Sequence, residues 1–281
     1  YEDLSCLLVD RVIAERLTAG DSIQLPYGKI MERLLIIKEM RDKNSAKKEE
    51  TTVLYNHLIA MAEKLLAKTK LSIDSPVAVI GDRSPSMGTA IKTSTIIASL
   101  LSAIANAELS FFSHQNYVPP EMPRTIEEVL CLASTLNTEG STIPAASLLP
   151  YYKEKKVVKT FILVTDEEEN GAVKHEGVSY RFQALFKKYT EEVYPAKLVF
   201  VSFLRSQHAH GQMVSELEEV GLAPLLQFRL NNQRPDLVKL GNLLGLLSRE
   251  ALGFADEVAA AERDIREEGL GPAMERLRLS N

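Results

Sequence analysis

The sequence has no tryptophan, only two cysteines and no long uninterrupted apolar segment. Cys6 and Cys131 are far apart and form no Cys-x-x-Cys motif, which excludes a disulfide framework and favours reduced thiols in an intracellular protein. The most apolar stretch, residues 91–107, is interrupted by Lys92 and several hydroxyl side chains, so no membrane span is expected. No signal-peptide pattern follows Tyr1. We therefore expect a cytoplasmic protein, with the nucleus as the alternative compartment.

The chain also lacks a strong net charge. Its 33 Lys and Arg residues against 38 Asp and Glu residues leave a net charge of -5, which excludes a general attraction to nucleic acid or anionic membranes. Residues 29–70 hold a local excess of basic side chains, and residues 153–159 hold a cluster of lysines. Neither segment has aromatic residues interleaved for base stacking, so solvated helix faces are the simpler interpretation.

Apolar patterning divides the 281 residues into three parts. Residues 1–72 carry apolar side chains at spacings of three or four, which predicts a helical extension, interpreted as the end of a larger helical domain. Within it, the charged run at residues 41–50 predicts a solvated loop. Residues 73–248 predict an α/β domain, and residues 249–281 a charged C-terminal helical extension. Because the sequence begins at Tyr1 and not at Met, we interpret it as a fragment.

Short apolar runs alternate with helical patterns throughout residues 73–248. This alternation predicts a mostly parallel central sheet with helices on both faces. The expected strands are residues 77–80, 109–112, 161–164, 198–203 and 225–230. The expected helices are residues 88–106, 125–136, 144–152, 180–193, 213–220 and 235–247.

Oxygen-bearing side chains follow the ends of these strands. Asp82, Ser84 and Ser86 alternate directly after the first strand, and Asp166 follows the third. Thr142 lies in the loop before the helix at residues 144–152. Since ligands bind at the carboxyl ends of parallel strands, these five side chains could share one cation. Asp and Ser also cap helices, and for the first loop alone that alternative stays open.

Oxygen ligands suit Mg²⁺, Mn²⁺ or Ca²⁺, whereas zinc favours Cys and His. The order and spacing resemble the von Willebrand factor A domain with its metal-ion-dependent adhesion site, whose pattern is Asp-x-Ser-x-Ser, a loop threonine and a strand-end aspartate. Residues 82–86, Thr142 and Asp166 match all five positions, and the likeness covers residues 73–247. The resemblance implies a Rossmann-like A domain.

Within that superfamily, residues 109–113, 140–142 and 164–168 are most similar to the A domain of Ro-type (TROVE) ribonucleoproteins. The resemblance implies that Ser84, Ser86 and Thr142 touch the ion, while Asp82 and Asp166 bind it directly or through water. A carboxylate of a protein partner would then replace an exchangeable water.

Two neighbouring features depart from the family pattern. Arg83 stands beside Asp82, where its guanidinium could pair with Asp166 or Glu167 and weaken ion binding. The acidic run at residues 167–169 adds negative potential, which attracts a cation and repels an acidic partner.

The expected function is a divalent-metal-dependent protein-interaction module and not an enzyme. One alternative is a Ro-like ribonucleoprotein component that binds small structured RNA. A less favoured alternative is a metal-dependent phosphohydrolase, since no histidine is obviously placed to act beside the ion. We expect no membrane partner, and the sequence leaves the oligomeric state open.

Overall fold

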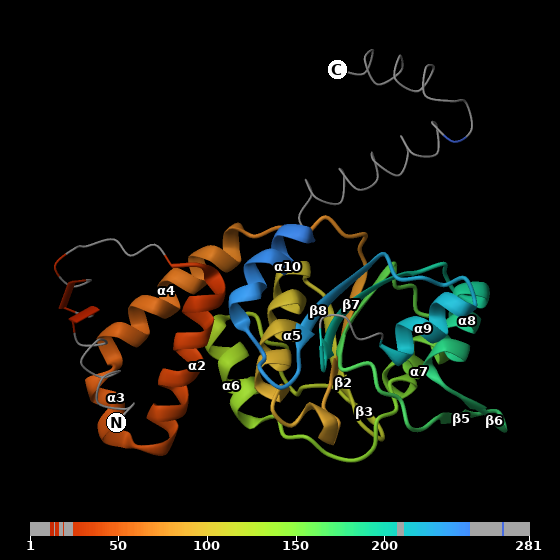
Figure 1. The fold of residues 1–281 in the computed structure, drawn as a ribbon, viewed down its shortest axis with the longest axis horizontal. Coiled ribbons are helices and arrows are strands. Elements are labelled where there is room, and N and C mark those ends of the chain that lie inside the picture. Colours follow the sequence, from red (N-terminus) through yellow and green to blue (C-terminus); the bar gives the residue numbers. More distant parts are fainter. Residues whose placement is uncertain are drawn as a thin grey trace, which may run out of the picture.

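The computed structural model describes residues 25–206 and 211–247, together with positions 12, 13, 15, 16, 19 and 266. A six-stranded sheet lies at its centre, in the order β3-β2-β1-β4-β7-β8 (Figure 1). These strands are β1 (Val77–Asp82), β2 (Glu108–Phe112), β3 (Asn116–Tyr117), β4 (Thr160–Thr165), β7 (Lys197–Leu204) and β8 (Leu226–Asn231). All neighbouring pairs are parallel except β2 with β3. The predicted α/β class and all five predicted strands are confirmed.

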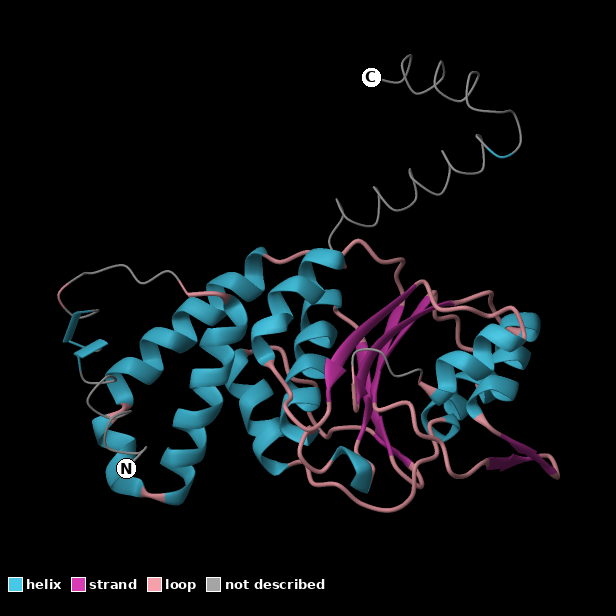
Figure 2. Cartoon of the chain, in the orientation of Figure 1, coloured by secondary structure: helices cyan, strands magenta, loops and turns pink. Residues whose placement is uncertain are grey.

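Helices cover both faces of this sheet (Figure 2). On one side of the sheet lie α5 (Ile91–Ala105), α6 (Ile126–Thr135), the 3-10 helix η2 (Leu237–Lys239) and α10 (Leu240–Leu246). Helices α2 (Tyr27–Lys43) and α4 (Thr52–Lys68) pack outside this layer, against its helices (Figure 1). The other face packs against α7 (Ala145–Lys153), α8 (Phe182–Glu192) and α9 (Gln212–Glu219). Because β1 and β4 are covered on both sides, all of their residues are buried.

The N-terminal helices share a core with the sheet. Leu34 of α2 and Leu58 of α4 belong to the same apolar cluster as Ile97 of α5 and Val129 of α6. Helix α6 begins with a capping box, in which Thr125 and Glu128 bond to each other's backbone amides. The division at residue 72 stays a prediction, although α2 and α4 contribute to one continuous apolar layer.

One prediction about local structure is wrong, and one predicted helix begins two residues later than expected. The charged run at residues 41–50 is helical and not a loop, since α2 continues to Lys43 and a short helix, α3, spans Ser45–Glu50. The helix predicted from residue 180 begins at Phe182, because a small hairpin precedes it, formed by β5 (Val173–His175) and β6 (Val178–Tyr180). Glu176 and Gly177 both adopt positive φ at its turn, as tight hairpins require.

The C-terminal extension at residues 249–281 lies outside the described residues, apart from position 266. Among the helices that the structure describes, none combines the length and apolar character that crossing a membrane would require.

Candidate functional site

The carboxyl ends of β1 and β4 bring two aspartates together. The strands pair in parallel, with Gly81 opposite Val164, so Asp82 at the end of β1 lies beside Thr165. The Thr165 hydroxyl donates to Asp82 Oδ2 at 2.7 Å. Asp166 directly follows the last residue of β4, and its charge raises the pKa of Asp82. Both carboxylates are buried, with 0% and 6% of Asp82 and Asp166 exposed.

The loop after β1 directs two serines toward these carboxylates. Asp82 Oδ1 accepts a hydrogen bond of 2.8 Å from the Ser84 backbone amide, which turns the chain back on itself. The Ser84 and Ser86 hydroxyls lie 2.9 Å apart, and the Ser86 side chain is near enough to Asp166 to lower the pKa of its carboxyl. Helix α5 begins later, after Ala90, and no side chain caps it. The helix-capping interpretation of this loop is therefore wrong.

The electrostatics of the pair are unfavourable for two ionised carboxylates. Burial is the main cause that raises the pKa of Asp82, and the charge of Asp166 raises it further. Burial likewise raises the pKa of Asp166. Asp166 Oδ1 accepts from the Glu168 amide at 3.2 Å, but Asp166 Oδ2 is buried without any hydrogen-bond partner. A buried oxygen without a hydrogen-bond partner destabilises the folded state. A proton or a cation at Asp166 Oδ2 would remove this cost.

Arg83 does not supply that cation. Its Nη2 lies 3.1 Å from Glu139 Oε2, and its Nε donates to the Asn137 carbonyl at 3.2 Å. The guanidinium also stacks 4.7 Å above the centre of the Tyr117 ring. The expected pairing with Asp166 or Glu167 is therefore wrong, because these partners draw the side chain away from the carboxylates.

Thr142 reaches the same edge from the loop before α7. Its amide donates to Asn170 Oδ1 at 2.9 Å and its carbonyl accepts from the Asn170 amide at 3.0 Å, which ties it to the loop after β4. Thr142 is buried. Within the described ranges, no hydrogen bond joins its hydroxyl to the other four predicted ligands. The structure thus joins Asp82, Ser84 and Ser86 by hydrogen bonds, brings Asp166 close to them and places Thr142 on an adjoining loop.

His114 flanks this threonine loop. Gly140 has φ +67, and a Cβ on it would lie 2.1 Å from the His114 ring nitrogen Nδ1. The close approach and the positive φ both favour glycine at this position.

The acidic run after Asp166 has a different role from the one expected. Glu167 is fully buried, and its carboxylate accepts from Gln227 Nε2 at 2.6 Å, from the Val214 amide at 3.1 Å and from the Ser202 hydroxyl. Its φ of 63 makes a left-handed turn directly after Asp166. Glu167 therefore ties the Asp166 loop to β7, β8 and α9. Only Glu168 of the run is exposed, and it lies 3.7 Å from Arg205.

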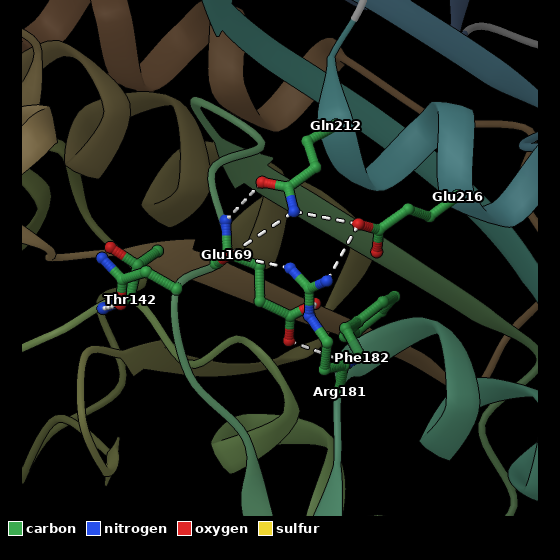
Figure 3. Close-up of polar contacts among 7 residues, drawn as sticks. Thr142, Glu169, Arg181, Phe182, Gln212 and Glu216 are labelled. Carbon is green, nitrogen blue, oxygen red and sulfur yellow. Dashed lines mark hydrogen bonds and ion pairs between the residues drawn. The ribbon is translucent and has the colours of Figure 1, made fainter.

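Glu169 forms a second connection, shown in Figure 3. Its carboxylate accepts from the Phe182 amide at 2.8 Å and lies 3.4 Å from Arg181 Nε. Gln212 accepts from the Glu169 amide at 3.1 Å, and both Gln212 and Arg181 contact Glu216. Burial raises the pKa of Glu169 to about 7. The sequence did not reveal these roles, since three consecutive glutamates are typical of a solvated surface.

The donor set fits a hard cation and not a zinc ion. It consists of two carboxylates and hydroxyl oxygens, with one carboxylate oxygen unsatisfied. Within residues 25–206 and 211–247, no group of three or more His, Cys, Asp or Glu side chains could hold a metal ion. Any site here therefore depends on the serine and threonine hydroxyls.

No protein-family model matches the chain, and no curated protein matches its sequence. Solved structures with a similar fold include the RO (RSR) protein of Deinococcus radiodurans, with 18% identity, a TM-score of 0.43 and coverage of 74% of this chain and 38% of that one. A von Willebrand factor type A protein from Catenulispora acidiphila has 13% identity, a TM-score of 0.37 and coverage of 63% and 42%. BatB from Bacteroides thetaiotaomicron has 13% identity, a TM-score of 0.36 and coverage of 61% and 97%. At these identities and scores, the likeness carries no conclusion about activity or partners.

Proposed function

We propose that the chain is a binding module that holds a divalent cation at the carboxyl edge of its sheet and uses it to bind a carboxylate of a protein partner. The ligands would be Asp82, Ser84, Ser86, Thr142 and Asp166, and the ion Mg²⁺, Mn²⁺ or Ca²⁺. The observation that carries the proposal is the buried Asp82–Asp166 pair, in which Asp166 Oδ2 has no partner and no described basic side chain forms an ion pair with either residue.

A cation would remove the physical conflict within this pair. Two buried carboxylates repel each other, and each loses hydration. When bound, a divalent ion supplies positive charge to both and an electrophilic centre for an incoming carboxylate. The serine and threonine hydroxyls add neutral ligands, so the ion keeps most of its charge for the partner.

The loops around the site are held in place from outside. Glu167 and Asn170 anchor the two ends of the segment after β4, through Gln227 on one side and Thr142 on the other. Preformed ligand loops reduce the ordering entropy that ion and partner binding must offset. This rigidity supports a binding role.

The test measures ion binding first and partner binding second. Isothermal titration with Mg²⁺ and Mn²⁺ should show one site in the native protein and none in Asp166→Asn, which keeps the shape and removes the charge. Glu176→Gln, at an exposed position in the β5–β6 turn, is the matched control and should bind as the native protein does. Equal binding by Asp166→Asn and the native protein would disprove the site.

Partner binding is tested by capture from lysate with Mg²⁺ or with chelator. We expect a partner that the native protein retains only with metal and that Asp166→Asn never retains. The RNA-binding and phosphohydrolase alternatives predict, respectively, salt-sensitive RNA retention and Mg²⁺-dependent turnover of phosphoesters. Two lysines of the basic cluster already pair with acids, Lys155 with Glu192 and Lys156 with Glu108, so we favour the protein partner.

A further inference from the structure

A pocket of about 230 Å³ lies where strand β3 leaves the sheet. Strand β3 pairs only with Phe111 and Phe112 of β2, and it is soon followed by Pro119 and Pro120, which cannot donate to a neighbouring strand. No described strand therefore covers the first three residues of β2 on this side. Helix α7 lies against both strands, and residues of β2, of the segment after β3 and of α7 line the pocket.

Ser110 brings a buried hydroxyl to this pocket. The residue is part of the lining, although only 3% of it is exposed. Its neighbours Leu109 and Phe111 belong to the apolar cluster on the opposite face of the sheet, so the Ser110 side chain points to the face that α7 covers. Ser110 Oγ has no hydrogen-bond partner. A polar ligand group that bonded to this hydroxyl would remove the cost of burying it.

Asn116 adds a second donor to the lining. Its Oδ1 accepts a hydrogen bond of 2.6 Å from the Ser147 hydroxyl on α7. Because this bond uses the amide oxygen, the amide nitrogen is the group that remains for a ligand. An amide nitrogen and a hydroxyl can both donate to one oxygen atom. The pair therefore suits a ligand that carries a hydroxyl or carbonyl oxygen.

The rim of the pocket is charged. It carries the carboxylates of Glu108 and Glu154 and the ammonium group of Lys156. Lys156 pairs with Glu108, whereas Glu154 forms no ion pair with any described residue. Burial, the main cause, and the charges of Glu108 and Glu154 raise the pKa of Tyr151, so both carboxylates lie near its hydroxyl. Two negative charges against one positive charge favour a cationic ligand.

We propose that this pocket binds a small organic amine that has an apolar body and a hydroxyl or carbonyl oxygen. The oxygen accepts from Ser110 and Asn116, and the ammonium group pairs with Glu154 at the rim. The apolar body packs against Met122 and Pro150, which also line the pocket. Drug-sized ligands occupy about 300–1,000 Å³, so this smaller pocket suits a compound below that size. None of the five proposed ion ligands lines it, so the proposal does not depend on the ion site.

Three related compounds test the proposal by isothermal titration of the full chain. Aminohexanol carries an ammonium and a hydroxyl at opposite ends of one alkyl chain, hexylamine lacks the hydroxyl and hexanol lacks the ammonium. We expect saturable binding of aminohexanol, about three- to tenfold tighter than that of hexylamine, as one neutral hydrogen bond provides. Its advantage over hexanol should be about two- to fivefold, because an exposed ion pair contributes less. No saturable binding of aminohexanol, or equal binding of all three compounds, would overturn the proposal.

Two variants assign these advantages to residues. Ser110→Ala should bind aminohexanol and hexylamine equally, and it should fold, because the hydroxyl that it removes has no partner. Glu154→Gln should bind aminohexanol and hexanol equally, and its exposed position keeps folding unaffected. Glu176→Gln, outside the lining, is the matched control and should bind as the native protein does. If Ser110→Ala or Glu154→Gln kept the full advantage of aminohexanol, the amine would bind elsewhere and the assignment would fail.

Discussion

Replacing Glu169 with glutamine should abolish a large pH dependence of folding stability. The carboxyl is buried, and its pKa rises from 4.5 to about 7, with burial as the main cause. This difference corresponds to about 3 kcal/mol between the protonated and ionised forms. The folded state therefore holds the proton more tightly than the unfolded chain. Protonation of Glu169 therefore stabilises the folded state. This contribution to the free energy of unfolding is fully present below about pH 4.5, decreases as pH rises and is lost above about pH 7.

Glutamine is neutral at every pH and keeps an oxygen for the Phe182 amide. Glu169→Gln should therefore match the native protein at pH 4.5 and exceed its free energy of unfolding by about 3 kcal/mol at pH 8. Urea denaturation across this range, with divalent ions chelated, measures the difference between the two proteins. Asp82 and Asp166 titrate in the same direction in both proteins, so their contribution cancels in the comparison.

The control is Glu176→Gln, since that side chain is highly exposed in the β5–β6 turn. It should leave the pH profile unchanged. If the free energies of unfolding of Glu169→Gln and of the native protein changed with pH in the same way, the Glu169 carboxyl would ionise freely in the folded state. The buried connection between the Asp166 loop and α8 would then be wrongly described.

Three further outcomes follow from the structure. Asp82→Asn should raise the melting temperature of the metal-free protein at neutral pH, because it removes the repulsion between Asp82 and Asp166. It should also abolish the increase in melting temperature that Mg²⁺ gives the native protein. An unchanged Mg²⁺ response in differential scanning fluorimetry would argue against the ion site. Gly211→Ala should lower the free energy of unfolding by about 1–3 kcal/mol in urea titration, because the added Cβ would lie 1.7 Å from Glu167 Oε2. The control is Gly241→Ala in α10, whose Cβ would meet nothing within 4 Å and which should be neutral or stabilising. Thr125→Ala should cost about 1 kcal/mol in urea denaturation by removing the capping box of α6, and a cost near zero would mean that the cap is dispensable.

Much of the fold could be predicted from the sequence because its signals are local. Runs such as residues 161–164 are apolar at every position, which is typical of a strand covered on both faces. The proposed oxygen ligands were predicted for a related reason, since Asp82 and Asp166 come just after such runs. Parallel strands then bring their carboxyl ends to one edge. The hairpin at residues 173–180 escaped prediction because its strands are short and partly exposed.

The sequence by itself determined which elements form and which side chains collect at the edge of the sheet. Only the tertiary structure decided what those side chains contact. The Arg83 side chain contacts Tyr117 and Glu139, and the Glu167 carboxylate accepts a hydrogen bond from Gln227. Such pairings join residues far apart in the chain, and no local pattern encodes them. Burial, which raises the pKa of the aspartates and of Glu169, likewise exists only once the layers have packed.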